Sequence, residues 1–176
     1  LQPDSGTVLV DGTDIGKKGA EAKKAKHSVG MVFQYPEHQL FEETVEKDVA
    51  FGPMRLGLSA QEVEERVRAA LDFVGLPVSE FGARSPFALS GGQRRRAAIA
   101  GVLALKPRYL VLDEPTAGLD PRASAALLAR LAELHEQGGV TIVLVSHNMD
   151  DIAHYADRLI VMHAGGVTLE GAPREV

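Results

Sequence analysis

The sequence has 176 residues, of which 45% are hydrophobic and 24% are charged, and its net charge is −5. This length is typical of one domain with a sizeable core, and the composition excludes disordered and fibrous proteins. The acidic balance argues against a protein that binds nucleic acid through bulk positive charge. Because there are no cysteines, disulfides, thiolate metal sites and cysteine nucleophiles are excluded as well.

The first predicted elements are a β-ribbon, a basic stretch and a strand. Residues 7–10 are β-prone and precede the pair Asp11-Gly12, a pattern that favours a tight antiparallel turn. The lysine-rich stretch from Lys17 to Lys26 is interpreted as a solvated helix or loop. Residues 28–33 then predict a short buried strand.

The middle of the chain is predicted to be helical. Ser59 and Glu62 form the pattern of a capping box, and the apolar residues that follow recur at helical spacing until Gly75. Another helix is predicted from Gly91 to Leu105, because Pro107 stops it. These helices form an insertion between strands.

The last third alternates strands and helices. Residues 109–112 and 140–145 are continuous apolar runs, which are typical of strands buried on both faces of a parallel sheet. Asp120 and Pro121 predict the start of a helix between these two strands. A short helix and two strands are predicted at residues 149–156, 158–162 and 167–170. The fold class is therefore α/β: a mostly parallel sheet flanked by helices, with an N-terminal antiparallel β part and an inserted helical subdomain.

Polar side chains follow three of the predicted strands. Asp113 and Glu114 come directly after a buried strand, at the sheet edge where ligands bind in open α/β folds. One carboxylate there can hold Mg²⁺, and its neighbour can orient or deprotonate a water. His147 and Gln34 follow two other strands. Taken singly, these residues are also explained as an acidic turn with a cap, a structural histidine and a surface glutamine.

The start of the helix at residue 91 is a possible phosphate site. Ser90–Gln93 leaves backbone N–H groups open at a helix N-terminus, where the macrodipole adds positive charge. A plain helix cap explains the same residues. The adjoining run Arg94–Arg96 is short in an acidic chain, so a structural or phosphate-adjacent role is favoured over a nucleic-acid patch.

Three segments together resemble the nucleotide-binding domain of ABC transporters. They are Leu89–Arg96 (LSGGQRRR), Leu110–Pro121 (LVLDEPTAGLDP) and Val145–His147 (VSH). The resemblance extends over essentially the whole chain. It implies a P-loop NTPase-like fold, ATP and Mg²⁺ as cofactors, and ATP hydrolysis between two subunits.

The resemblance assigns catalytic and metal-binding roles to four residues. Glu114 resembles the catalytic base and His147 the switch histidine. Gln34 resembles the Q-loop glutamine, which touches Mg²⁺ and the attacking water and couples to the transmembrane partner. Asp113 resembles the Walker B aspartate, which implies a role in holding Mg²⁺.

The resemblance also assigns residues that contact the nucleotide of a partner. Ser90, Gly91, Gly92 and Gln93 resemble the signature motif, which contacts the γ-phosphate of ATP held by the opposite subunit. Asp120 resembles the D-loop aspartate at the dimer interface, and this role is compatible with its capping a helix.

Residues 32–41 and 44–53 resemble the ATPase of energy-coupling factor importers, which take up vitamins or transition-metal ions such as cobalt and nickel. This resemblance implies a peripheral protein at the cytoplasmic face of the plasma membrane. Its partners would be a second ATPase subunit, identical or related, and a transmembrane subunit, but no nucleic acid. One alternative is an ABC ATPase acting off the membrane in DNA repair or translation, although residues 34–90 leave no room for a coiled coil. The other is a non-catalytic fragment or degenerate subunit.

The phosphate cradle G-x-x-x-x-G-K-[ST] is not present in the sequence. The nearest segment, Gly16-Lys17-Lys18, has Asp11 where the first Gly should stand and Lys18 in place of Ser or Thr. In members of the family, the P-loop and its helix come directly before the segment that corresponds to Leu1–Thr7 of this sequence. We therefore expect that the chain starts just after that helix, which the missing initiator Met fits, and that it does not bind ATP in its own site.

We interpret residues 1–176 as a partial ABC ATPase domain. Residues 1–34 and 107–176 are predicted to form the sheet core, and residues 35–106 a helical subdomain that includes the signature motif. Without the P-loop strand, apolar edges beside the remaining strands are expected to be exposed.

Overall fold

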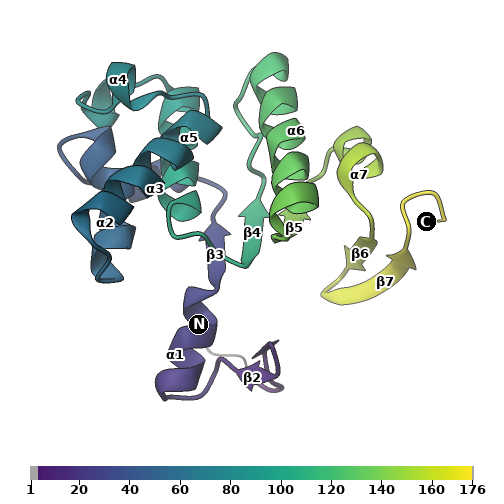
Figure 1. Ribbon diagram of the computed structural model, residues 1–176. Helices are drawn as coiled ribbons and strands as arrows, with labels where there is room; N and C mark the ends of the chain where they lie inside the picture. Colours follow the sequence, from purple (N-terminus) through teal and green to yellow (C-terminus); the bar gives the residue numbers. More distant parts are fainter. Residues whose placement is uncertain (1–3, 176) are drawn as a thin grey trace.

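The computed structural model describes residues 4–175. Leu1–Pro3 and Val176 lie outside the described residues, and with them the start of the segment compared above with the stretch after the P-loop helix. The described part contains a three-stranded sheet, helices over one of its faces, and an antiparallel β pair toward each end of the chain (Figure 1). This arrangement confirms the predicted α/β class.

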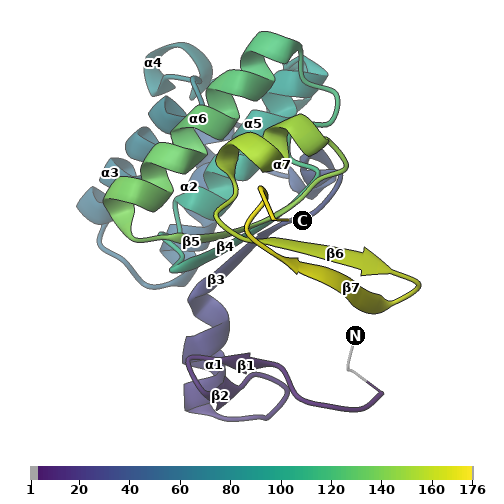
Figure 2. The same ribbon diagram turned by 90° about the vertical axis from the view of Figure 1, so that its right-hand side faces the viewer.

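The N-terminal part is a ribbon followed by a helix. Strands β1 (Leu9–Val10) and β2 (Thr13–Asp14) pair antiparallel. Asp11 and Gly12 join them with φ values of 49° and 76°, and a two-residue hairpin turn requires positive φ at both positions. The lysine-rich stretch forms α1 (Ala20–His27), and Figure 2 shows the ribbon and α1 below the sheet, apart from the other helices.

The central sheet is parallel throughout. Strands β3 (Val29–Val32), β4 (Tyr109–Asp113) and β5 (Thr141–Val145) lie in the order β3-β4-β5. Asp113 pairs with Val145, so β4 and β5 end level with each other. The residues that follow the three strands therefore lie at the same edge of the sheet.

The segment between β3 and β4 is helical. Its elements are η1 (Pro36–Gln39), α2 (Val45–Arg55), α3 (Ala60–Phe73), α4 (Val78–Phe81), η2 (Pro86–Ala88) and α5 (Gly91–Leu103). The predicted capping box is confirmed at α3, where Ser59 and Glu62 exchange hydrogen bonds. The Ser59 hydroxyl is the main cause that lowers the pKa of the Glu62 carboxyl. Whether this segment forms a separate subdomain stays a prediction.

The C-terminal part follows the predicted order of elements. These are α6 (Pro121–Gly138), β5, α7 (Met149–Tyr155), and the hairpin of β6 (Leu159–His163) and β7 (Gly166–Gly171). The predicted cap of α6 is confirmed, because Asp120 Oδ1 accepts the backbone N–H groups of Arg122 and Ala123, each at 3.0 Å.

The two faces of the sheet differ in burial. Val32, Leu110 and Leu112 are fully buried in the core shared with α5 and α6. Burial of each such leucine contributes roughly 1.5–3 kcal/mol. On the other face, Met31 and Val143 are 45% and 49% exposed. The prediction of burial on both faces is therefore wrong for β5, where Val143 is exposed, whereas Tyr109 and Val111 of β4 are half-buried. The helices cover one side of the sheet (Figure 2).

Met31 belongs to β3 and Val143 to β5, the two outer strands of the sheet. Whether the expected apolar edges result from the missing P-loop strand stays a prediction. In the described part of the chain, no helix combines the length and the apolar character needed to cross a bilayer.

Candidate functional site

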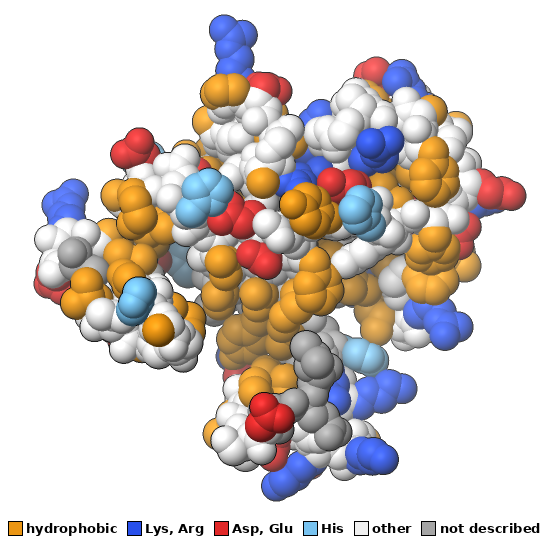
Figure 3. All heavy atoms as spheres, turned by 180° about the vertical axis from the view of Figure 1, so that it is seen from behind, with side chains coloured by type: hydrophobic (Ala, Val, Ile, Leu, Met, Phe, Trp, Pro, Cys, Tyr) orange, Lys and Arg blue, Asp and Glu red, His pale blue; other side chains and the backbone are white. Residues whose placement is uncertain are grey.

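Glu114 and His147 meet at the carboxyl edge of the sheet. Glu114 directly follows β4, and His147 lies two residues after the end of β5. His147 Nδ1 is 2.7 Å from Glu114 Oε1. The Glu114 side chain is 17% exposed and that of His147 is 86% exposed, so a shielded carboxylate is held by a solvent-facing imidazole. Figure 3 shows acidic and histidine side chains in the middle of the molecule, above a gathering of hydrophobic ones.

The backbone of Glu114 is strained. Its φ is 49°, in the left-handed region, and its N–H donates to the carbonyl of Val145 at 2.9 Å. A non-glycine residue in this region costs about 1–3 kcal/mol, and such residues cluster at active sites. Here the conformation ends the strand sharply and accompanies the contact of the carboxylate with His147.

The Glu114–His147 pair has the geometry of an oriented base. Because the imidazole Nδ1 donates to Oε1 of the carboxylate, Nε2 of His147 remains available toward solvent. The second carboxylate oxygen, Oε2, is left to accept a proton from a water within hydrogen-bond reach. The arrangement suits removal of a proton from a bound water.

Asp113 and Gln34 offer oxygen ligands near that pair. Asp113 is partly buried at the end of β4, and none of the ion pairs formed within residues 4–175 involves it. Gln34 follows β3, and its backbone carbonyl shares a hydrogen-bond donor, the Arg95 guanidinium, with the carbonyl of Glu114. Carboxylate and amide oxygens suit Mg²⁺, which takes one or two carboxylates and completes its shell with phosphates and waters.

Protein groups alone do not make a metal centre in the described residues. No group of three or more His, Cys, Asp or Glu side chains comes together between residues 4 and 175. The residues present therefore fit Mg²⁺ bound together with a phosphate-bearing substrate better than a permanently bound metal.

The Ser90–Gln93 segment forms the capped start of α5. Ser90 Oγ accepts the N–H of Gln93 at 3.3 Å, and the Ser90 N–H donates to Gln93 Oε1 at 2.9 Å. A Cβ placed on Gly91 would meet no atom within 4 Å, so the first turn of the helix is open to an incoming group. On Gly92 a Cβ would lie 3.2 Å from Leu119 Cδ2, which places the signature segment beside the residues that lead to Asp120.

The structure therefore divides the predicted residues into two groups. One consists of Glu114 and His147, in direct contact, with Asp113 and Gln34 at the same edge. The other consists of Ser90–Gln93 and Asp120, and no hydrogen bond between described residues joins it to Glu114 or His147.

The sequence did not reveal the role of Arg95. Its side chain is buried, with 4% of its surface exposed, and its guanidinium contacts the segments of Gln34 and Glu114. Arg96, in contrast, donates to the carbonyls of Val74 and Gly75. Helical spacing gave a usable signal, because Arg95 lies four residues before the fully buried Ile99.

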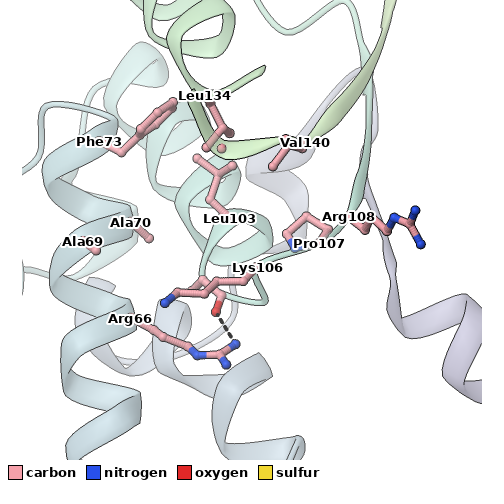
Figure 4. A pocket seen from close by; sticks show the side chains of 13 residues that line it. Arg66, Ala69, Ala70, Phe73, Leu103, Lys106, Pro107, Arg108, Leu134 and Val140 are labelled. Atoms are coloured by element: carbon pink, nitrogen blue, oxygen red, sulfur yellow. Dashed lines mark hydrogen bonds between the residues drawn. The ribbon is translucent and has the colours of Figure 1, made fainter. Parts of the chain in front are cut away.

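A cavity of about 490 Å³, shown in Figure 4, is separate from the predicted site residues. It is lined by Phe73, Leu103, Leu134 and Val140, near the amino ends of β4 and β5, and none of the predicted site residues lines it. Arg66, on its wall, donates to the carbonyls of Ala104 and Leu105. The predicted site lies instead at the carboxyl edge of the sheet, where the side chain of His147 is 86% exposed.

The sequence matches curated proteins over its whole length. It is 51% identical over 176 residues to the energy-coupling factor transporter ATP-binding protein EcfA2 of Clostridium tetani and covers 61% of that protein. It is 53% identical to EcfA2 of Caldanaerobacter subterraneus, again covering 61% of it. The chain thus spans about three fifths of the length of these relatives.

The fold also matches solved structures. The structure of cbiO1 from Clostridium perfringens, described as part of the ABC transporter complex cbiONQ, aligns with a TM-score of 0.85 and 39% identity over 99% of this chain and 69% of that one. The dimeric bacterial ABC transporter cassette MJ0796 aligns with a TM-score of 0.86 and 29% identity, over 99% of this chain and 76% of that one.

These likenesses establish the α/β fold of P-loop NTPases for the described residues. The model of the ABC transporter family matches residues 1–117, two thirds of the sequence. That match, together with the likeness to the ATP-binding relatives, shows that the chain belongs to the ABC transporter family.

Proposed function

We propose that these residues serve an ATP-binding and ATP-hydrolysing subunit that powers an importer of the energy-coupling factor type. ATP and Mg²⁺ are the cofactors of the family. The observation that carries the proposal is the 2.7 Å contact between Glu114 and His147 at the carboxyl edge of the sheet. The names of the relatives support the type of importer, and the imported substrate we propose is a vitamin or a transition-metal ion.

In the proposed mechanism Glu114 accepts a proton from the water that attacks the γ-phosphate. His147 holds one oxygen of that carboxylate through Nδ1 and presents Nε2 toward the phosphate. Asp113 and Gln34 would hold Mg²⁺, which when bound offsets the charge of the phosphates. The partial burial of Glu114 limits competition from bulk water for its carboxylate.

The proposed active unit is a dimer. Ser90–Gln93 would bind the phosphates of ATP held by a second subunit, identical or related, and Asp120 would lie at the interface. The open space above Gly91 and the dimeric form of the relative MJ0796 support this geometry. Because the phosphate-cradle motif is not among the 176 residues, we propose that these residues alone do not turn over ATP.

The proposed partner in the membrane would contact an aromatic patch formed by Phe41, which precedes α2, and Phe51 of α2. Phe41 and Phe51 are 58% and 43% exposed and pack edge to face at 4.9 Å. The Phe41 N–H donates to Asp48 of α2, which fixes the loop on the helix. Grouped exposed apolar side chains mark interaction surfaces. We place the subunit at the cytoplasmic face of the membrane, bound there through its transmembrane partner.

Replacing His147 by Ala tests the catalytic part of the proposal. In the protein that carries these residues, turnover of Mg²⁺-ATP should fall about 10²-fold or more, because Glu114 loses the group that orients it. His163→Ala, which removes an exposed histidine of β6, is the matched control and should retain full turnover. Phosphate release at saturating ATP measures both. Equal turnover in the two variants would refute the assignment.

Replacing Phe41 by Ser tests the partner surface. Copurification with a co-expressed transmembrane subunit should fall about tenfold, since an exposed aromatic anchor of an interface contributes about 1–2 kcal/mol or more. Leu169→Ser, at an exposed apolar position of β7, is the control and should copurify normally. Undiminished copurification of the Phe41 variant would remove this surface from the proposal. Copurification with nucleic acid instead would favour an ABC ATPase that acts off the membrane.

A further inference from the structure

Arg95 is the only polar or charged residue that is buried among residues 4–175. Only 4% of its surface is exposed. Taking a guanidinium out of water is unfavourable unless its charge is paired and its N–H groups find acceptors. The contacts of the guanidinium explain why an arginine is buried at this position.

The guanidinium bridges two loops from its place on α5. Nε lies 3.4 Å from Oε2 of Glu37, which supplies the opposite charge. Nη2 donates to the carbonyl of Gln34, in the loop after β3. Nη1 donates to the carbonyl of Glu114 at 3.4 Å and to that of Ala117 in the same turn.

We propose that Arg95 is a positioning residue for catalysis, and the proposal rests on the function proposed above for Glu114 and Gln34. Its guanidinium holds the carbonyl of Glu114 and thereby stabilises the left-handed conformation that accompanies the contact between the carboxylate and His147. The same group holds the carbonyl of Gln34. One side chain thus fixes the relative position of the proposed base and the proposed Mg²⁺-contacting glutamine.

Arginine suits this position because its planar fork offers five N–H donors in fixed directions. A lysine ammonium keeps the charge opposite Glu37 but is a single point on a flexible stem. It cannot satisfy at once the carbonyls of Gln34 and Glu114 while remaining beside the carboxylate. Arg95→Lys is therefore a sharp test, since it conserves charge and removes the bridge.

The first readout is hydrogen exchange without nucleotide. The Ala117 N–H donates to the carbonyl of Glu114 at 3.1 Å, so its exchange rate reports whether the turn is closed. In the protein that carries these residues, Arg95→Lys should raise this rate about tenfold. The matched control is Arg66→Lys, because Arg66 also donates to two backbone carbonyls, those of Ala104 and Leu105, away from the site.

The second readout separates turnover from binding. Arg95→Lys should lower kcat about 10–100-fold and change KM for ATP less than threefold, because the base is displaced while the nucleotide contacts remain. Arg66→Lys should leave both constants unchanged. A merely structural role for Arg95 would lower the Tm of both arginine variants alike without selective loss of kcat.

A charge-balanced variant keeps the test decisive where Arg95→Lys does not fold. Glu37→Gln combined with Arg95→Gln leaves no buried charge unpaired, and it should show the same loss of kcat. Full kcat together with unchanged exchange at Ala117, in whichever variant folds, would overturn the proposal. Glu114→Gln is measured in parallel: if it retains full turnover, the proposed function fails, whereas the exchange at Ala117 still decides whether Arg95 holds the turn.

Discussion

Replacing Glu114 by Gln is expected to lower ATP turnover about 10²–10⁴-fold, the range that a general base contributes. The amide has nearly the same shape as the carboxylate, and its oxygen still accepts the hydrogen bond from His147 Nδ1, which lies 2.7 Å from Oε1 in the native pair. It does not take up a proton from water. Binding of ATP should therefore persist while its cleavage stops.

The measurement is the nucleotide content of the purified protein together with steady-state phosphate release. The Glu114→Gln variant should accumulate as an ATP-bound dimer in the presence of Mg²⁺. Glu64→Gln is the control, because Glu64 forms an exposed pair with Arg68 that is worth little to stability and is remote from the site. Normal turnover of the Glu114 variant would assign the base to another residue.

Replacing Gly91 by Glu is expected to abolish ATP-dependent dimerisation while leaving the fold intact. Gly91 is the first residue of α5, and a Cβ there would meet no atom within 4 Å. A carboxylate in the first turn is favoured by the helix dipole by about 0.3–1 kcal/mol, so the free energy of unfolding should stay level or rise. The same carboxylate would stand where a partner's γ-phosphate is proposed to bind, and like charges repel.

Ala60→Glu is the matched control for this variant. Ala60 is the exposed first residue of α3, which begins with a capping box of the same kind, Ser59 with Glu62. Both variants thus add one acidic side chain at the same position of a capped helix. Size-exclusion chromatography with and without ATP measures association, and denaturant unfolding measures stability. An Ala60 variant that also fails to dimerise would show a charge effect unrelated to the signature segment.

Elements whose signals are local could be predicted from the sequence. The capping box at Ser59, the Asp120 cap and the Asp11-Gly12 turn each depend on a few neighbouring residues, and all three are confirmed. Helix α2 was not specified, because Gly52 and Pro53 near its end are poor helix formers. Tertiary packing overrides propensity there: Val45, Val49 and Pro53 are buried.

Features that depend on packing between distant segments escaped prediction. Continuous apolar runs do not tell how many faces of a strand are covered, and the open face that includes Met31 and Val143 shows the difference. The contact of Glu114 with His147 joins residues 33 positions apart, and sequence order predicted only that both follow strands of one sheet. The bridging role of Arg95 required knowledge of two loops at once.

The left-handed backbone conformation of Glu114 lowers the stability of the fold but is kept at a residue proposed to act in catalysis. Among the described residues, the other non-glycine positions with positive φ are Asp11, Lys106 and Ala164, and each lies in a short connection between two elements. At residue 114 glycine would relax the chain, yet only a carboxylate serves the proposed reaction. A search for thermostable variants that is guided by folding energy alone would replace Glu114 early. Such a search would remove the residue of this sheet edge on which the proposed turnover depends.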